Sequence, residues 1–102
     1  MGNRVLVQLK SNEEVSPVLY GHWSGDNAEI WLHKLIEKMG ERLDDLSYSF
    51  ARLAQIAMDS SKEQVTGFGI WNQEKELVAS DSHGDAGIYI LNVETKEITH
   101  LT

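Results

Sequence analysis

The stretch Leu19-Tyr20-Gly21-His22-Trp23-Ser24-Gly25-Asp26-Asn27 decides how the chain is organised. It follows an apolar segment with the period-two alternation of a strand and precedes a segment with the spacing of a helix. Polar and aromatic side chains gather at this junction, and ligand sites often lie in such connecting segments. We therefore expect a change of secondary structure and a candidate binding site in the same place.

Two strands are predicted at the start of the chain. Residues 3–10 alternate, with Val5, Val7 and Leu9 on one face and Arg4, Gln8 and Lys10 on the other. Leu6 interrupts the polar face, so some cover over that face is expected. A second strand begins at Ser16-Pro17 and places Val18, Tyr20 and His22 on one face and Leu19 and Trp23 on the other. We expect an antiparallel hairpin that brings Arg4 near His22.

Two helices are predicted in the middle of the chain, over about residues 27–39 and 44–58. Asp26, with Glu29 three residues later, resembles a capping box, and Gly40 supplies a stop. Asp44 or Asp45 is available to cap the second helix. The apolar stripes are Ala28, Trp31, Leu32, Leu35, Ile36 and Met39 in the first helix, and Leu43, Leu46, Phe50, Leu53, Ala54 and Ala57 in the second.

Strands return in the last third, over residues 65–71, 76–80, 88–93 and 97–101, with a loop at 81–87. Gly67 and Gly69 leave a flat groove on one face, where either a helix or ring packs closely or a ligand approaches the backbone. The order ββααβββ, with a fourth late strand at 76–80, predicts an α+β fold in a single domain, residues 1–102. It has two layers, an antiparallel sheet of about five strands with two helices packed on one face.

Composition excludes several classes of function. The chain has 102 residues, a net charge of −7 and no cysteine, which excludes disulfides, thiolate metal ligands and cysteine nucleophiles. The acids are scattered and no basic cluster is present, so direct binding of nucleic acid is not expected. No secretory or membrane-spanning pattern is recognised, and we expect a cytoplasmic protein without a membrane partner.

The histidines are the first candidates for chemistry. His22 at a strand end and His83 in a loop are better placed for a site than His33 and His100, which we interpret as surface residues. Asp81-x-His83-x-Asp85 is interpreted mainly as an Asp-rich turn, with metal binding as the lesser alternative. No Gly-x-Ser-x-Gly elbow or phosphate-binding loop is present, and no cofactor or metal is predicted.

The three tryptophans are expected to differ in their surroundings. Trp31 lies on the apolar stripe of the first helix and is predicted to be core. Trp23 and Trp71 end strands, and exposure of either one would favour a dimer contact or the cover of a groove. A homodimer is therefore among the expected partners.

Residues 2–7, Gly-Asn-Arg-Val-Leu-Val, and 18–25, Val-Leu-Tyr-Gly-His-Trp-Ser-Gly, carry a resemblance. They resemble a broad group of small proteins from phages, plasmids, integron cassettes and microbial genomes, which start with Gly-Thr-Arg and a strand and later have Tyr-x-His/Gln-Trp-Asp-Gly. Residues 83–89 are similar to a loop-to-strand element in some members. Asn3 and Ser24 depart from the usual Thr and Asp. The resemblance implies a mobile-gene setting and an α+β fold, and it carries over no catalytic residue.

These observations favour a small non-enzymatic binding or interaction module, which would recognise a protein or a small molecule. Its candidate binding residues are Arg4, Tyr20, His22, Trp23, Asp26, His83 and Asp85. One alternative is a small enzyme with His22 or His83 as acid or base, which requires that histidine within about 3 Å of a carboxylate or hydroxyl in a cavity. A second alternative is an acidic DNA-mimic inhibitor with one contiguous negative face.

Overall fold

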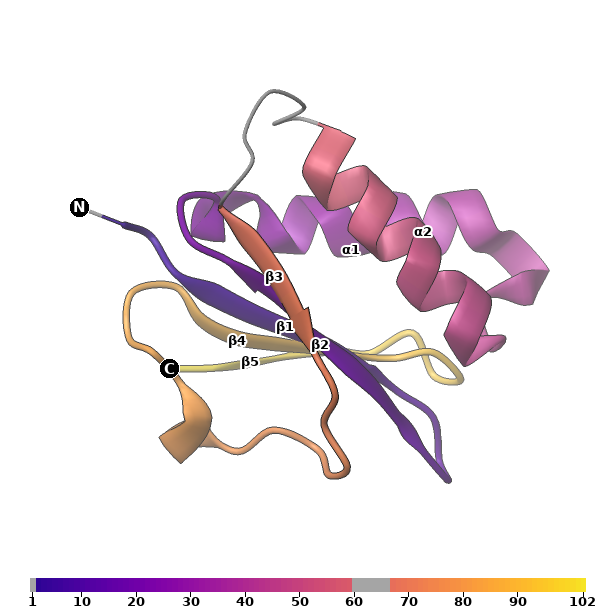
Figure 1. Ribbon diagram of the computed structural model, residues 1–102. Helices are drawn as coiled ribbons and strands as arrows, with labels where there is room; N and C mark the ends of the chain where they lie inside the picture. The colour runs from indigo at the N-terminus through magenta and orange to yellow at the C-terminus, as the bar shows by residue number, and fades with distance from the viewer. Residues whose placement is uncertain (1, 60–66) are drawn as a thin grey trace.

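One five-stranded sheet organises the computed structural model of the protein, which describes residues 2–59 and 67–102. The strands lie in the order β3-β2-β1-β4-β5 (Figure 1). Their bounds are β1 (Val5–Lys10), β2 (Val15–Gly21), β3 (Phe68–Trp71), β4 (Gly87–Asn92) and β5 (Ile98–Leu101). The predicted α+β class and the general order of elements are confirmed. The predicted residues 65 and 66 of the third strand lie outside the described part.

The sheet is mixed, whereas a wholly antiparallel one was predicted. β1 pairs with β2, β2 with β3, and β4 with β5 in antiparallel fashion, but β1 and β4 run parallel. β2 already occupies one side of β1, and the connection at residues 72–86 carries the chain from β3 to the other side. A connection of this length permits a parallel crossover, which a tight hairpin cannot make.

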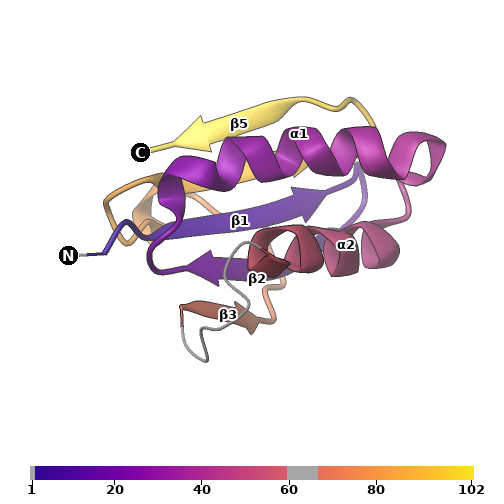
Figure 2. The same ribbon diagram turned by 90° about the horizontal axis from the view of Figure 1, so that it is seen from above.

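Two helices cover one face of the sheet, as predicted (Figure 2). They are α1 (Ala28–Met39) and α2 (Leu46–Asp59), each within about two residues of its predicted bounds. The core between helices and sheet includes Val7, Leu19, Leu32 and Leu53, all fully buried. Trp31 belongs to it, as expected, and is 3% exposed.

The start of α1 differs from the predicted capping box. Asp26 lies inside a short 3-10 turn (Gly25–Asn27), and Asn27 takes the cap position without a side-chain hydrogen bond. Because that turn continues directly into α1, the Asp26 carboxylate is not placed over the first free amides of the helix. For α2, the Tyr48 backbone N–H donates to Oδ1 of Asp45 at 3.4 Å, which selects Asp45 over Asp44.

The other face of the sheet is covered by residues 72–83 instead of a fourth late strand. The predicted strand at 76–80 is wrong, because the segment is irregular and ends in a 3-10 turn (Ala79–Asp81). Its buried Leu77 packs with Leu6, Val18 and Ile90 in a second core cluster, which explains the apolar Leu6 on the polar face. The Leu77 backbone N–H donates to the side chain of Gln8 and so makes no strand pairing.

None of the helices in residues 2–59 and 67–102 is both long and apolar enough to cross a membrane.

Candidate functional site

Six of the seven predicted site residues gather at one end of the face that the helices leave free. Register places Val5 opposite Gly21, and the Asn3 backbone N–H donates to the carbonyl of His22 at 2.8 Å, so Arg4 lies beside His22 as expected. The loop before β4 brings His83 and Asp85 to the same end. Asp26 is the exception, because it lies in the 3-10 turn that leads directly into α1.

Tyr20, His22 and Trp23 form a connected aromatic row at the end of β2. The hydroxyl of Tyr20 lies 2.6 Å from Nδ1 of His22. The indole of Trp23 meets the His22 ring edge-on, with 4.4 Å between ring centroids. Tyr20 and His22 are half-buried and Trp23 is 52% exposed, so the row presents a fixed polar pair and an open ring to solvent.

Trp71 also belongs to this site, although it is not among the residues predicted from the sequence. Its ring lies 6.1 Å from the Tyr20 ring and 6.2 Å from the His83 ring, while Tyr20 and His83 are 5.5 Å apart. Three rings from β2, β3 and the 81–87 loop therefore form one cluster. An antiparallel register of β3 with β2 would have predicted this position, because Trp71 pairs with Val18 and so lies on the same face of the sheet as Tyr20.

Arg4 and Asp85 form an ion pair beside the aromatic row. Nε of Arg4 lies 2.9 Å from Oδ2 of Asp85, and the Arg4 backbone N–H donates to the same oxygen at 3.0 Å. This backbone hydrogen bond, followed by the one from the guanidinium, lowers the pKa of Asp85 below its usual 3.8. The pair neutralises both charges and fixes the 81–87 loop to the start of β1.

The neighbouring Asp81 behaves as the predicted turn residue. Its carboxylate accepts from the Val78 backbone N–H at 2.9 Å, so Asp81 and Asp85 have separate partners. Within the described residues, no group of three or more His, Asp or Glu side chains could hold a metal ion. His33 and His100 are exposed, and Nε2 of His100 donates to the Ala86 carbonyl at 2.7 Å.

A hollow of about 430 Å³ opens beside the aromatic row, lined by Tyr20, His22, Trp23, Gly67 and Phe68. Its volume lies in the range of small-molecule sites. Gly67 contributes only backbone to the lining, and a Cβ added at Gly69 would meet only the Tyr20 ring, at 3.9 Å. Of the two alternatives for the predicted glycine groove, the approach of a ligand to the backbone is therefore sterically possible beside Gly67.

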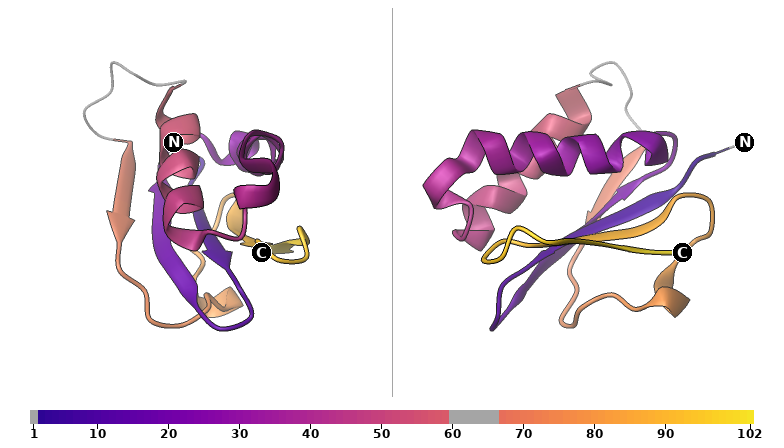
Figure 3. Two further views of the ribbon diagram at one scale, coloured as in Figure 1. Left: turned by 90° about the vertical axis from the view of Figure 1, so that its right-hand side faces the viewer. Right: turned by 180° about the vertical axis from the view of Figure 1, so that it is seen from behind.

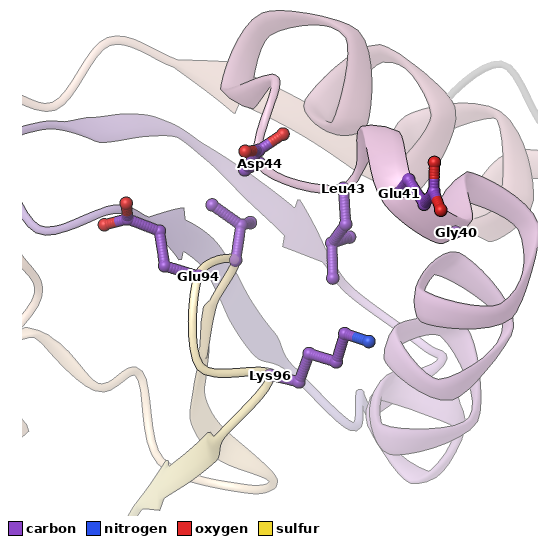
Figure 4. Close-up of a pocket in the computed structure, with 7 residues that line it drawn as sticks. Gly40, Glu41, Leu43, Asp44, Glu94 and Lys96 are labelled. Atoms are coloured by element: carbon purple, nitrogen blue, oxygen red, sulfur yellow. The ribbon is translucent and has the colours of Figure 1, made fainter.

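A second hollow, of about 490 Å³, lies where the link between the helices meets the β4–β5 turn (Figure 4). Its charged side chains are Glu41, Asp44, Glu94 and Lys96. No aromatic or histidine side chain lines it, so it lacks the stacking surface of the first hollow.

The Arg4–Asp85 pair predicts an acid-sensitive contact. Because folding lowers the pKa of Asp85, the stabilisation is complete above the usual value of 3.8 and is lost as the pH falls through the lower folded value. We expect the NMR signals of the Arg4 backbone amide and Nε–H to titrate below pH 3.8 in the native chain and to show no such step in Asp85→Asn. Asparagine suits this position, whose φ is 56°. Asp81→Asn is the matched control and should leave the Arg4 titration unchanged; an unaltered titration in Asp85→Asn would contradict the assignment.

Comparison with known proteins finds no matching family model, no similar curated protein and no similar solved structure.

Proposed function

We propose that the protein is a non-enzymatic binding module whose ligand is a small uncharged molecule with a flat ring, held in the hollow beside Tyr20, His22 and Trp23. The observation that carries the proposal is the hollow itself, about 430 Å³ bordered by four aromatic side chains and by Gly67. Exposed rings offer stacking area at low conformational cost, and the glycine lets a ligand reach the backbone.

The electrostatics favour a ligand without net charge. Arg4, the nearest cation of the site, is already paired with Asp85. The Tyr20 hydroxyl, which contacts Nδ1 of His22, still has hydrogen-bonding capacity for a polar substituent, whereas Nε2 of His22 lies close to the main chain at Gly2. The Tyr20 hydroxyl would orient the ring that stacks on Trp23.

Trp23→Ala is expected to weaken ligand binding while leaving the fold intact. Stacking on one aromatic side chain contributes about 0.5–1.5 kcal/mol, so we expect a loss of roughly twofold to thirteenfold in affinity. Ring-containing fragments can be screened by NMR, with the Trp23 indole N–H and the His22 ring signals as reporters. Tyr48→Ala, at a 61% exposed ring on α2, is the matched control. The proposal fails if no fragment shifts these signals, or if both variants bind equally well.

A small enzyme remains the second candidate, because the Tyr20 hydroxyl and Nδ1 of His22 are 2.6 Å apart at the edge of a hollow. Two facts favour binding over catalysis. The main chain at Gly2 lies close to Nε2 of His22, since a Cβ there would be 2.9 Å away, and no carboxylate among the described residues hydrogen-bonds to His22. Mass spectrometry of bound fragments after incubation separates the two, since an enzyme would change their covalent structure.

The remaining alternatives have less support. The exposed side of α1 mixes Glu37 with Lys34 and Lys38, whereas a DNA mimic needs one negative face. An accessory role in a mobile element is supported only by the short motifs at residues 2–7 and 18–25.

A further inference from the structure

β3 is an edge of the sheet without the usual protection against pairing. It ends the strand order, and Figure 3 (left) shows it at the outer side of the sheet, away from α1. Residues 67–73 contain no charged residue and no proline. Ile70 is 50% and Trp71 38% exposed. Natural edge strands usually carry a lysine, a proline or a bulge, so a bare apolar edge indicates a place for another strand.

The ladder between β2 and β3 shows which backbone groups this edge presents. The His22 backbone N–H donates to the Gly67 carbonyl at 2.8 Å, and Tyr20 and Val18 pair with Gly69 and Trp71. Hydrogen-bonded pairs alternate along an antiparallel ladder. The N–H and C=O groups of Phe68 and Ile70 therefore point away from β2, toward the open side.

We propose that two copies of the chain pair through β3, antiparallel, about a twofold axis at Gly69. In this register Phe68 of one copy lies opposite Ile70 of the other, so the outward N–H and C=O groups of both residues are satisfied in both copies. The two sheets become one continuous sheet. The dimer does not depend on the ligand proposed above.

The side chains are complementary in the same register. On the helix side, Phe68 meets Ile70 of the second copy, an aromatic and β-branched pair of the kind that stabilises sheets. On the other side the two Gly69 residues meet at the axis, and Trp71 faces Gly67 of the second copy, which has no side chain. Trp71 thereby closes the open side of the other copy's hollow. The strand is neutral, so the −7 charge of each chain is not concentrated at the contact.

Gly69→Cys tests the register directly, because the chain has no other cysteine. A Cβ at Gly69 makes only an ordinary contact, 3.9 Å from the Tyr20 ring. Residues facing each other at a non-hydrogen-bonded position have Cα atoms about 4.5 Å apart, within reach of a disulfide. We expect Gly69→Cys to form a disulfide-linked dimer severalfold faster than Val78→Cys, whose position is 55% exposed but away from β3. Equal rates would overturn the register.

The oligomeric state tests the interface without a cross-link. Sedimentation of the native, ligand-free chain should show a mass that rises with concentration toward twice 11.5 kDa. Ile70→Lys should remain monomeric, whereas Ile30→Lys, at a 51% exposed position on α1, should dimerise like the native chain. Circular dichroism checks that both variants fold. A native chain that is monomeric at all concentrations would overturn the proposal and leave the edge to a strand from a different protein.

Discussion

Gly87→Ala is expected to destabilise the protein by about 2–6 kcal/mol, a large part of the total stability of a domain of this size. Gly87 begins β4 with a φ of 79°, and an added Cβ would lie 2.3 Å from the carbonyl oxygen of Leu101 in β5. The unfavourable backbone conformation costs about 1–3 kcal/mol, and displacing a packed backbone group costs about 1–3 kcal/mol more. Urea unfolding followed by circular dichroism measures the change.

The chain offers a control that separates these two contributions. Gly40, at the end of α1, has a φ of 54°, but an added Cβ would meet nothing within 4 Å. Gly40→Ala should therefore carry only the conformational cost, about 1–3 kcal/mol. If Gly40→Ala destabilises the fold as much as Gly87→Ala, the contact with β5 contributes nothing. Gly87→Ala should also disturb the Arg4–Asp85 pair, because the turn from Gly84 to Gly87 sets the position of Asp85.

The periodicity of apolar residues predicted those helices and strands whose buried face is visible within one segment of the sequence. The stripes of α1 and α2 place Leu32 and Leu53 in the core because a buried helix face repeats on a period that is visible within one segment. The alternation of β1 was equally informative for Val5, Val7 and Leu9. In these segments propensity, pattern and burial agree, and neighbours distant in sequence are not needed to interpret them.

The parallel pairing of β1 with β4 could not be inferred in the same way. Alternation specifies which face of a strand is buried, but it does not specify which strand lies alongside or in which direction. The outcome depends on residues 72–83, which cross the free face through contacts of Leu77 with Leu6 and Val18. The apolar Leu6 was the one local sign that something covers that face.

The candidate site was partly predictable. Tyr20, His22 and Trp23 lie together because they are neighbours in sequence, and hairpin pairing adds Arg4. Asp85 and His83 reach the site through the crossover, which sequence alone did not show. Asp26 lies apart from the other six predicted residues, because it belongs to the turn that leads into α1.

Gln8 was predicted to be an outward polar residue of β1, but it is buried. Substitution of Gln8 is therefore the second change with a large expected effect on stability. Its side chain is 0% exposed. Nε2 donates to the carbonyls of Ser16 and Lys75, at 3.1 and 3.3 Å, and Oε1 accepts from the Leu77 backbone N–H at 2.9 Å. One amide thus fixes the crossing segment to the sheet and satisfies three backbone groups.

Gln8→Leu is therefore expected to destabilise the protein by about 2–5 kcal/mol, because each buried backbone group left unpaired costs about 1–3 kcal/mol and part of that cost is relieved by access to water. The loss of structure should begin in the segment of residues 72–83 that crosses the sheet. Amide hydrogen exchange at Leu77 should accelerate more than at β1, and the affinity for a ring fragment should fall because His83 is carried by the released segment.

Lys10→Leu is the matched control for Gln8→Leu. It places the same residue on the same strand and face, and it removes only the partly exposed ion pair between Nζ of Lys10 and Oε1 of Glu76, at 3.0 Å. Such pairs contribute about 0–1 kcal/mol, so Lys10→Leu should leave exchange at Leu77 nearly unchanged. Equal exchange in the two variants would show that the crossing segment is held by apolar contacts of Leu77 alone. Faster exchange confined to Gln8→Leu would instead show that a buried amide in β1 positions the segment that carries His83 into the proposed ligand site.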